Sequence, residues 1–196
     1  MSKTAEPSLK SLIPALAKTL RLAPAALYER QRALVRANLL RNRPGRGPGS
    51  GVEFTPHSLA LLLISLLATD SLSETEEATR ALAKLKSAKG QCPLTGKKTF
   101  AQAVTAVLGS NKLMSSTMFV TARRVPPHGA QSDRRATIAY LDSSYDDAFI
   151  DDRNLLGEPF PVSVFGAGAP LAEAKLSVNA TLILPWEWRP QLMAGS

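Results

Sequence analysis

The stretch from His57 to Ala68 constrains the fold more than any other feature, because it predicts a helix that is apolar on nearly every side. Thr55 and Pro56 precede it, and a hydroxyl cap followed by a proline in the first turn is typical of a helix start. Its longest apolar run, residues 59–68, is much shorter than the ~20 residues that a membrane-spanning helix needs. We therefore expect this helix to be buried, either in the core of the chain or against a second subunit.

Periodicity along the rest of the chain predicts an α+β fold with a helical front and a strand-rich back. Helices are expected over residues 8–20, 24–40, 57–68, 73–87 and 99–108. Ser8 can cap the first helix, although Pro14 favours a helix that becomes regular near that residue. Ser71 or Ser73 can cap the fourth helix, and Ser73 with Glu76 has the form of a capping box. Alternating or β-branched residues predict strands over residues 117–121, 136–141, 162–165 and 176–184.

Positive charge is concentrated towards the N-terminus. The net charge is +8, and residues 1–55 carry ten lysines and arginines against three aspartates and glutamates. Residues 56–132 carry nine against four, whereas residues 133–196 carry five against nine. A basic front and an acidic back indicate that a polyanion would contact one end of the protein only.

Residues 13–40 have the pattern of two helices joined by a tight turn. Ala17 is small where the helices must cross closely, Leu22 is expected to fill the turn, and Leu27 is expected to hold the second helix against the first. If these side chains are buried, the opposite face of the second helix is left to solvent. That face carries Ala25, Tyr28, Glu29, Arg32 and Arg36.

The segment that follows the second helix, residues 41–51, has the sequence RNRPGRGPGSG and no apolar anchor. Its four glycines and two prolines predict an exposed turn, and Val52-Glu53-Phe54 alternates as a short strand does. Three arginines, Arg41, Arg43 and Arg46, would therefore lie on a protruding basic loop.

Together these residues resemble a winged helix-turn-helix. The order helix, turn, helix, hairpin and helix over residues 8–68 is similar to the MerR-type arrangement, and Leu27-Tyr28-Glu29-Arg30 and Phe54-Thr55-Pro56 share local features with that family. The resemblance implies that a recognition helix, about residues 24–38, enters the major groove of double-stranded DNA. The basic loop at residues 41–51 would be the wing, with its arginines on the DNA backbone or in the minor groove.

We therefore expect a sequence-specific transcriptional regulator and not an enzyme. Residues 1–55 would bind DNA, residues 56–110 would connect or dimerise, and residues 111–196 would form a strand-rich effector or protein-interaction domain. A homodimer is expected because a lone two-helix reader makes few base contacts. No catalytic residue, metal ligand, cofactor or membrane contact is expected. One cysteine and the lack of a signal segment favour a cytoplasmic protein.

Two alternatives stay open at this point. The first is a protein-interaction or assembly adaptor without nucleic-acid binding, which would use the apolar helix at residues 57–68 and the strand-rich back half. The second is an enzyme, which would need polar groups that converge from separate strands within residues 113–190.

Three further motifs are interpreted as surface structure. Gly96-Lys97-Lys98-Thr99 resembles the end of a phosphate-binding loop, but the upstream glycine spacing is wrong, so a surface turn is expected. The segment VSVFGAG, residues 162–168, lacks the third glycine of a dinucleotide fingerprint and predicts a strand followed by a loop. An acidic cluster matches no calcium-loop spacing and predicts a solvated hairpin; it consists of Asp142, Asp146, Asp147, Asp151 and Asp152.

Overall fold

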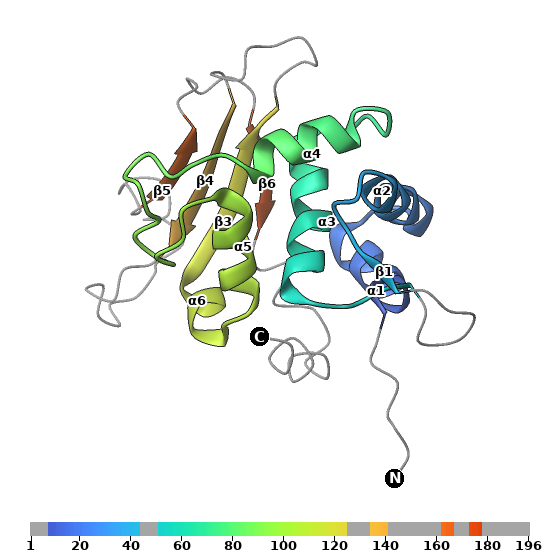
Figure 1. Cartoon of the computed structure of the whole chain (residues 1–196). Coiled ribbons are helices and arrows are strands. Elements are labelled where there is room, and N and C mark those ends of the chain that lie inside the picture. Colours follow the sequence, from blue (N-terminus) through green and yellow to red (C-terminus); the bar gives the residue numbers. More distant parts are fainter. Residues whose placement is uncertain (1–7, 44–50, 125–133, 141–161, 167–172, 178–196) are drawn as a thin grey trace.

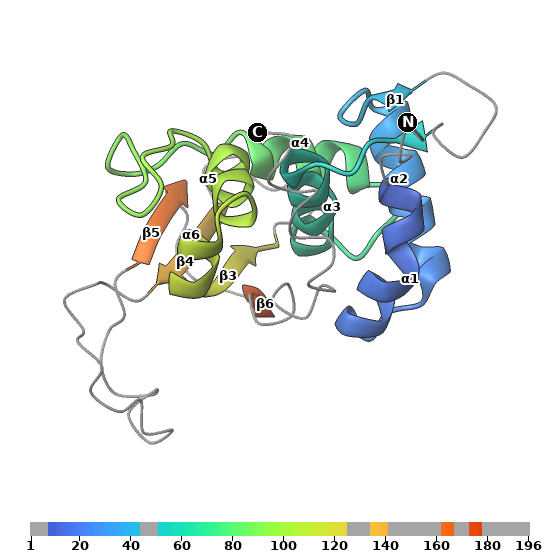
Figure 2. The ribbon, with the colours of Figure 1, turned by 90° about the horizontal axis from the view of Figure 1, so that it is seen from below.

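Helix α3 (Pro56–Ala68) lies at the centre of the molecule (Figure 1). The computed structural model describes residues 8–43, 51–124, 134–140, 162–166 and 173–177. Every side chain of α3 is buried except those of His57 and Leu66. Figures 1 and 2 both place the pair α1 (Leu9–Leu20) and α2 (Pro24–Arg36) on one side of α3, and α5 (Phe100–Leu108) on the other. The predicted burial is confirmed, and the chain itself covers the helix.

The first two helices form where the sequence predicted them but differ at their ends. The side chain of Ser8 caps α1 by accepting from the Ser11 N–H, so the helix begins at Leu9 with Pro14 on its exposed surface. The expectation of a start near Pro14 was wrong. Helix α2 ends at Arg36 and not near Leu40, because Asn38 takes a left-handed conformation with φ 55° that ends the helix.

A short antiparallel hairpin follows α2. It consists of β1 (Asn42–Arg43) and β2 (Gly51–Val52), in which Arg43 pairs with Gly51. Gly51 has φ 114°, a conformation that favours glycine. The strand expected at residues 52–54 is thus shifted towards the loop, and Glu53 instead forms a single bridge with Ser8 at the start of α1. The hairpin is therefore held against the N-terminal end of α1.

Helix α4 (Thr75–Ala83) is shorter than predicted and starts differently. Its N-cap is Glu74, without a side-chain cap, so the expected capping box of Ser73 and Glu76 is absent. Helix α5 has a capping box between Thr99 and Gln102. Helix α6 (Asn111–Ser116), which the sequence analysis missed, follows at once and is capped by Ser110.

Four strands form an antiparallel sheet in the order β5-β4-β3-β6, with α5 and α6 over one face (Figures 1 and 2). The strand expected at residues 176–184 begins earlier, at residue 173, and the residues after 177 lie outside those described. The acidic cluster at residues 142–152 also lies outside them. The bounds are β3 (Thr117–Arg123), β4 (Arg135–Tyr140), β5 (Val162–Gly166) and β6 (Glu173–Ser177).

One buried core runs from α1 through α3 and α5 into β3 and β4, from Leu9 to Ile138. The structure is a mixture of helices and strands, which agrees with the expected α+β class. The division at residues 55 and 110 remains a prediction. No helix in the described ranges is both long and apolar enough to cross a membrane.

Ser8 and Ser73, both of which the sequence offers as caps, should differ in their effect on stability. Ser8→Ala removes a side-chain cap from α1 and is expected to lower the free energy of unfolding by about 1 kcal/mol. Ser73→Ala is the matched control. Within the described residues, the Ser73 side chain forms a hydrogen bond with the Ser71 hydroxyl and caps no helix. Urea unfolding should show no more than ~0.5 kcal/mol for Ser73→Ala. Equal losses would contradict the assignment of the caps.

Candidate nucleic-acid interface

A three-residue turn sets the angle between α1 and α2. Arg21 ends α1 in the left-handed conformation with φ 54°, and the Leu22 N–H donates to the Ala17 carbonyl at 2.9 Å. Pro24 then occupies the first position of α2, where its missing N–H costs nothing. Ala17 and Leu27 are buried between the helices as predicted. Leu22 is 40% exposed, so the expectation that it fills the turn was wrong.

The predicted recognition face lies on the outer side of α2. Ala25, Arg32 and Arg36 are exposed, and Tyr28 and Glu29 are half-buried. Arg41 is also exposed, just after the helix, and Arg43 pairs in β1. Arg46 lies outside the described residues, and so does the tip of the hairpin, residues 44–50.

Glu29 and Arg32 form an ion pair on this face. The Arg32 Nη1 lies 2.7 Å from the Glu29 Oε1, and the Arg32 side chain is 71% exposed. Exposed pairs of this kind contribute about 0.2–1 kcal/mol and are screened by salt. Arg32 can therefore exchange Glu29 for another anion at little cost.

Helix α1 adds a lysine to the same surface. Lys10, Tyr28, Gln31 and Arg32 line a shallow cavity of about 360 Å³ between the two helices. Lys10 is exposed, and its charge extends the positive surface of α2 onto α1. The sequence analysis missed Lys10, although its place next to buried Leu9 on a periodic helix was a usable signal.

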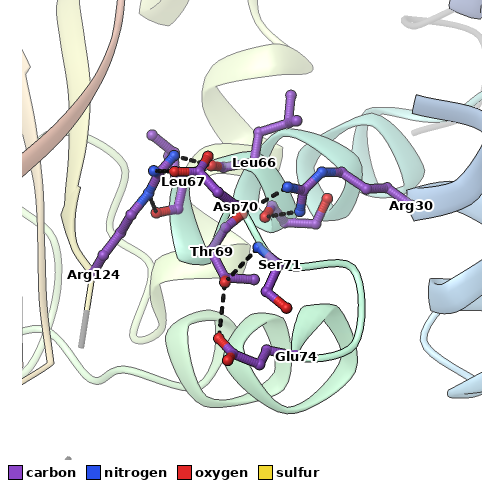
Figure 3. A network of polar contacts seen from close by, with 9 residues as sticks. Arg30, Leu66, Leu67, Thr69, Asp70, Ser71, Glu74 and Arg124 are labelled. Atoms are coloured by element: carbon purple, nitrogen blue, oxygen red, sulfur yellow. Dashed lines mark hydrogen bonds and ion pairs between the residues drawn. The ribbon is translucent and has the colours of Figure 1, made fainter. Parts of the chain in front are cut away.

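Arg30 points the other way, into the molecule. Its side chain is 5% exposed, and its guanidinium donates to the carbonyls of Ser65 at 2.8 Å and Thr69 at 2.7 Å (Figure 3). Burial lowers the pKa of the Arg30 guanidinium, Asp70 raises it in part, and Arg124 lowers it further. Arginine side chains are not deprotonated in folded proteins, so the group keeps its charge at neutral pH. Arg30 thus fixes α2 onto the C-terminal end of α3.

Arg124, which follows β3, reaches the same end of α3 from the opposite side (Figure 3). It donates to the carbonyls of Leu66 at 2.9 Å and Leu67 at 3.3 Å, and it forms an ion pair with Asp70. Two arginines from separate elements therefore satisfy carbonyls that α3 leaves without partners in its last turn. Positive side chains are also favourable next to the negative end of the helix dipole.

Arg80 of α4 stabilises the C-terminal end of α2. Its Nη2 donates to the Ala37 carbonyl at 2.9 Å and lies 3.1 Å from the Glu76 Oε1. Together, Arg30 and Arg80 hold α2 from its inner side. The outer arginines of α2 are consequently presented on a helix with fixed orientation.

No group of three histidine, cysteine, aspartate or glutamate side chains that could hold a metal ion occurs within the described parts of the chain. His57 lies 3.4 Å from the Thr105 hydroxyl through its Nδ1, and His128 is outside the described residues. The candidate interface consists of exposed cations on the outer face of α2.

Comparisons of the chain with models of protein families, with curated protein sequences and with solved structures found no match. The case for a function rests on the residues and contacts described above.

Proposed function

We propose that this protein binds double-stranded DNA through the outer face of α2 and the hairpin that follows it, as a winged helix-turn-helix of MerR-like order. The observation that carries the proposal is the exposure of Arg32 and Arg36 on one face of a helix whose third arginine, Arg30, is buried. Phosphates supply most of the affinity of such proteins, and exposed guanidinium groups bind them well.

The dimensions of α2 suit one half-site. Ala25 and Arg36 are eleven residues apart on the helix, which corresponds to about 16 Å at 1.5 Å per residue. Along B-DNA this length spans roughly five base pairs at 3.4 Å each. Ala25, small and exposed at the first turn, allows close approach to base edges, while Arg32 and Arg36 reach bases or phosphates further along.

Five base pairs specify too little sequence for a regulator, so we propose that the protein acts as a homodimer on paired half-sites. The buried helix α3 leaves no apolar face for the dimer contact, because its side chains already pack within the chain. The same argument applies to an adaptor that would use α3 as its binding surface. A contact surface, in either case, has to lie on other elements.

The proposal is tested by mobility shift with genomic fragments at low salt. We expect retardation of a subset of fragments and a steep loss of affinity as salt rises. If no fragment is retarded at low salt, the proposal is wrong. Equal retardation of all fragments would indicate non-specific DNA binding and exclude a sequence-specific regulator.

Arg43→Ala should weaken binding almost equally on every DNA sequence, because a residue at the start of the wing is expected to contact phosphates. The affinity is expected to fall several-fold, and the slope of log affinity against log salt concentration should decrease in magnitude by about one. Measured affinities for the preferred fragment and for a scrambled fragment test this. A loss confined to the preferred fragment would contradict the phosphate role of Arg43.

Glu29→Gln should strengthen DNA binding about two- to five-fold, because it releases Arg32 from its ion pair and removes a negative charge from the interface. Glu77→Gln is the matched control, since Glu77 is an exposed glutamate on another helix, α4. Fluorescence anisotropy with a labelled duplex measures both variants. Equal gains would mean that net charge and not the local pair controls the affinity.

A further inference from the structure

A second polar site lies on the far side of α3 from the proposed DNA-binding face. It is a cavity of about 790 Å³ between the start of α3, the outer face of α5 and the turn at residues 96–98. Figures 1 and 2 both place α5 and α2 on opposite sides of α3, so α3 separates this cavity from the exposed arginines of α2. The volume falls within the range of roughly 300–1,000 Å³ that is typical of small-molecule sites.

The lining of the cavity carries positive charge, and none of its described residues is acidic. Lys97 and Lys98 lie on the turn, His57 lies at the start of α3, and Gln102 and Thr105 lie on α5. Pro56 and Ala106 supply apolar surface beside them. Cations and hydrogen-bond donors next to an apolar wall suit a ligand that has both an anionic group and an apolar body.

The backbone of the lysine turn is fixed by hydrogen bonds. The Cys92 N–H donates to the Lys97 carbonyl at 2.8 Å, and the Ser87 N–H donates to the Lys98 carbonyl at 2.9 Å. Cys92 is 1% exposed and anchors the loop in the core. Gly96, with φ 68°, permits the sharp turn. The backbone that carries the two exposed lysines is therefore ordered before binding, and only their side chains have to be ordered by a ligand.

The opposite wall is also ordered. The Thr105 hydroxyl donates to the Ala101 carbonyl at 2.7 Å and lies 3.4 Å from the His57 Nδ1. The Gln102 side chain accepts from the Thr99 N–H and so completes the capping box of α5. The Thr105 and Gln102 side chains thus occupy defined positions. They lie beside residues 96–98, which are exposed as the predicted surface turn requires.

We propose that this cavity binds a small organic anion, a carboxylate or a phosphate ester with an apolar body. Lys97 and Lys98 bind the anionic group, and Pro56 and Ala106 contact the apolar part. This site does not depend on the proposed DNA-binding function, because the two use different elements and different residues.

Calorimetric titration of the full chain with benzoate, phenyl phosphate, inorganic phosphate and neutral benzamide tests the proposal. We expect at least one of the two organic anions to bind with a Kd below about 1 mM, and benzamide and inorganic phosphate to bind at least about tenfold more weakly. The stronger of the two organic probes identifies the anionic group. If neither organic anion binds, or if benzamide binds equally well, the proposal is wrong.

Two variants localise the binding. The double variant Lys97→Gln with Lys98→Gln should lower the affinity for the bound probe about tenfold or more. The control, Lys86→Gln with Lys89→Gln, removes the same charge from exposed positions outside the cavity and should change that affinity less than about twofold. Ala106→Leu should block binding of the apolar part of the ligand without changing the thermal unfolding midpoint of the protein. Equal effects of the two lysine pairs would overturn the proposal.

The same two lysine variants separate this site from the DNA-binding surface. Lys97→Gln with Lys98→Gln should change DNA affinity no more than the control pair does. A selective loss of DNA binding would instead assign the lysine turn to the nucleic-acid interface and overturn the small-ligand site.

Discussion

Replacement of Arg30 by methionine is expected to lower the free energy of unfolding by about 3 kcal/mol, because it leaves buried carbonyls without donors. Arg30 is 5% exposed and donates to the carbonyls of Ser65 and Thr69, so methionine fills part of the volume but satisfies neither. Arg30→Lys should fall between wild type and methionine, since an ammonium group lacks the planar fork that reaches both carbonyls. Urea unfolding followed by circular dichroism measures the loss.

Arg32→Ala is the matched control for this experiment. It removes an arginine two residues away on the same helix, but that side chain is 71% exposed and forms an exposed ion pair with Glu29. Its loss of stability should stay within about 0.5 kcal/mol. If the two variants lose equal stability, the inward position of Arg30 is wrong.

The second large effect is expected on DNA binding. Replacement of both Arg32 and Arg36 by alanine should weaken binding to the preferred duplex about 100-fold, since each specific or phosphate contact contributes about 1–3 kcal/mol. The free energy of unfolding should change little, because both side chains are exposed. Anisotropy titrations at several salt concentrations should also show a smaller salt dependence.

A second double variant controls for the loss of charge. Lys84 and Lys86 are exposed cations that follow α4, away from the outer face of α2. Their replacement by alanine removes the same two charges and should weaken binding only a few-fold through the general field of the protein. Similar losses in both double variants would contradict a localised interface on α2.

Local chemistry was predictable where neighbours in the sequence make the contacts. Ser8 and Thr55 cap helices as their positions suggested, and α3 is buried because its composition leaves no polar face. The fifth helix, expected from residue 99, begins at Phe100 with Thr99 as its N-cap. Several local predictions nevertheless failed. Ser73 does not cap α4, although it has the required spacing to Glu76. The Thr69 hydroxyl instead bonds the carboxylate of Glu74, the residue that starts the helix.

The spacing of Arg30 in α2 was enough to predict that its side chain is buried. Leu27 and Leu34 are buried, and Arg30 lies three residues after the first and four before the second, which places it on the same stripe. That spacing was a signal that Arg30 faces inward, and it separates Arg30 from Arg32. Of the face expected to be exposed, Ala25, Arg32 and Arg36 are exposed and Tyr28 and Glu29 are half-buried, while no position was predicted for Arg30.

By itself, the sequence determined the helical periods, several caps and the burial of α3, because these depend on residues within a few positions of one another. Only the tertiary structure decided which carbonyls Arg30 and Arg124 satisfy, since their partners lie 35 to 58 positions away along the chain. It also brought His57 next to Thr105, 48 positions apart, in the lysine-lined cavity. Distances of this kind are fixed by how the helices and the sheet pack, and no local pattern encodes them.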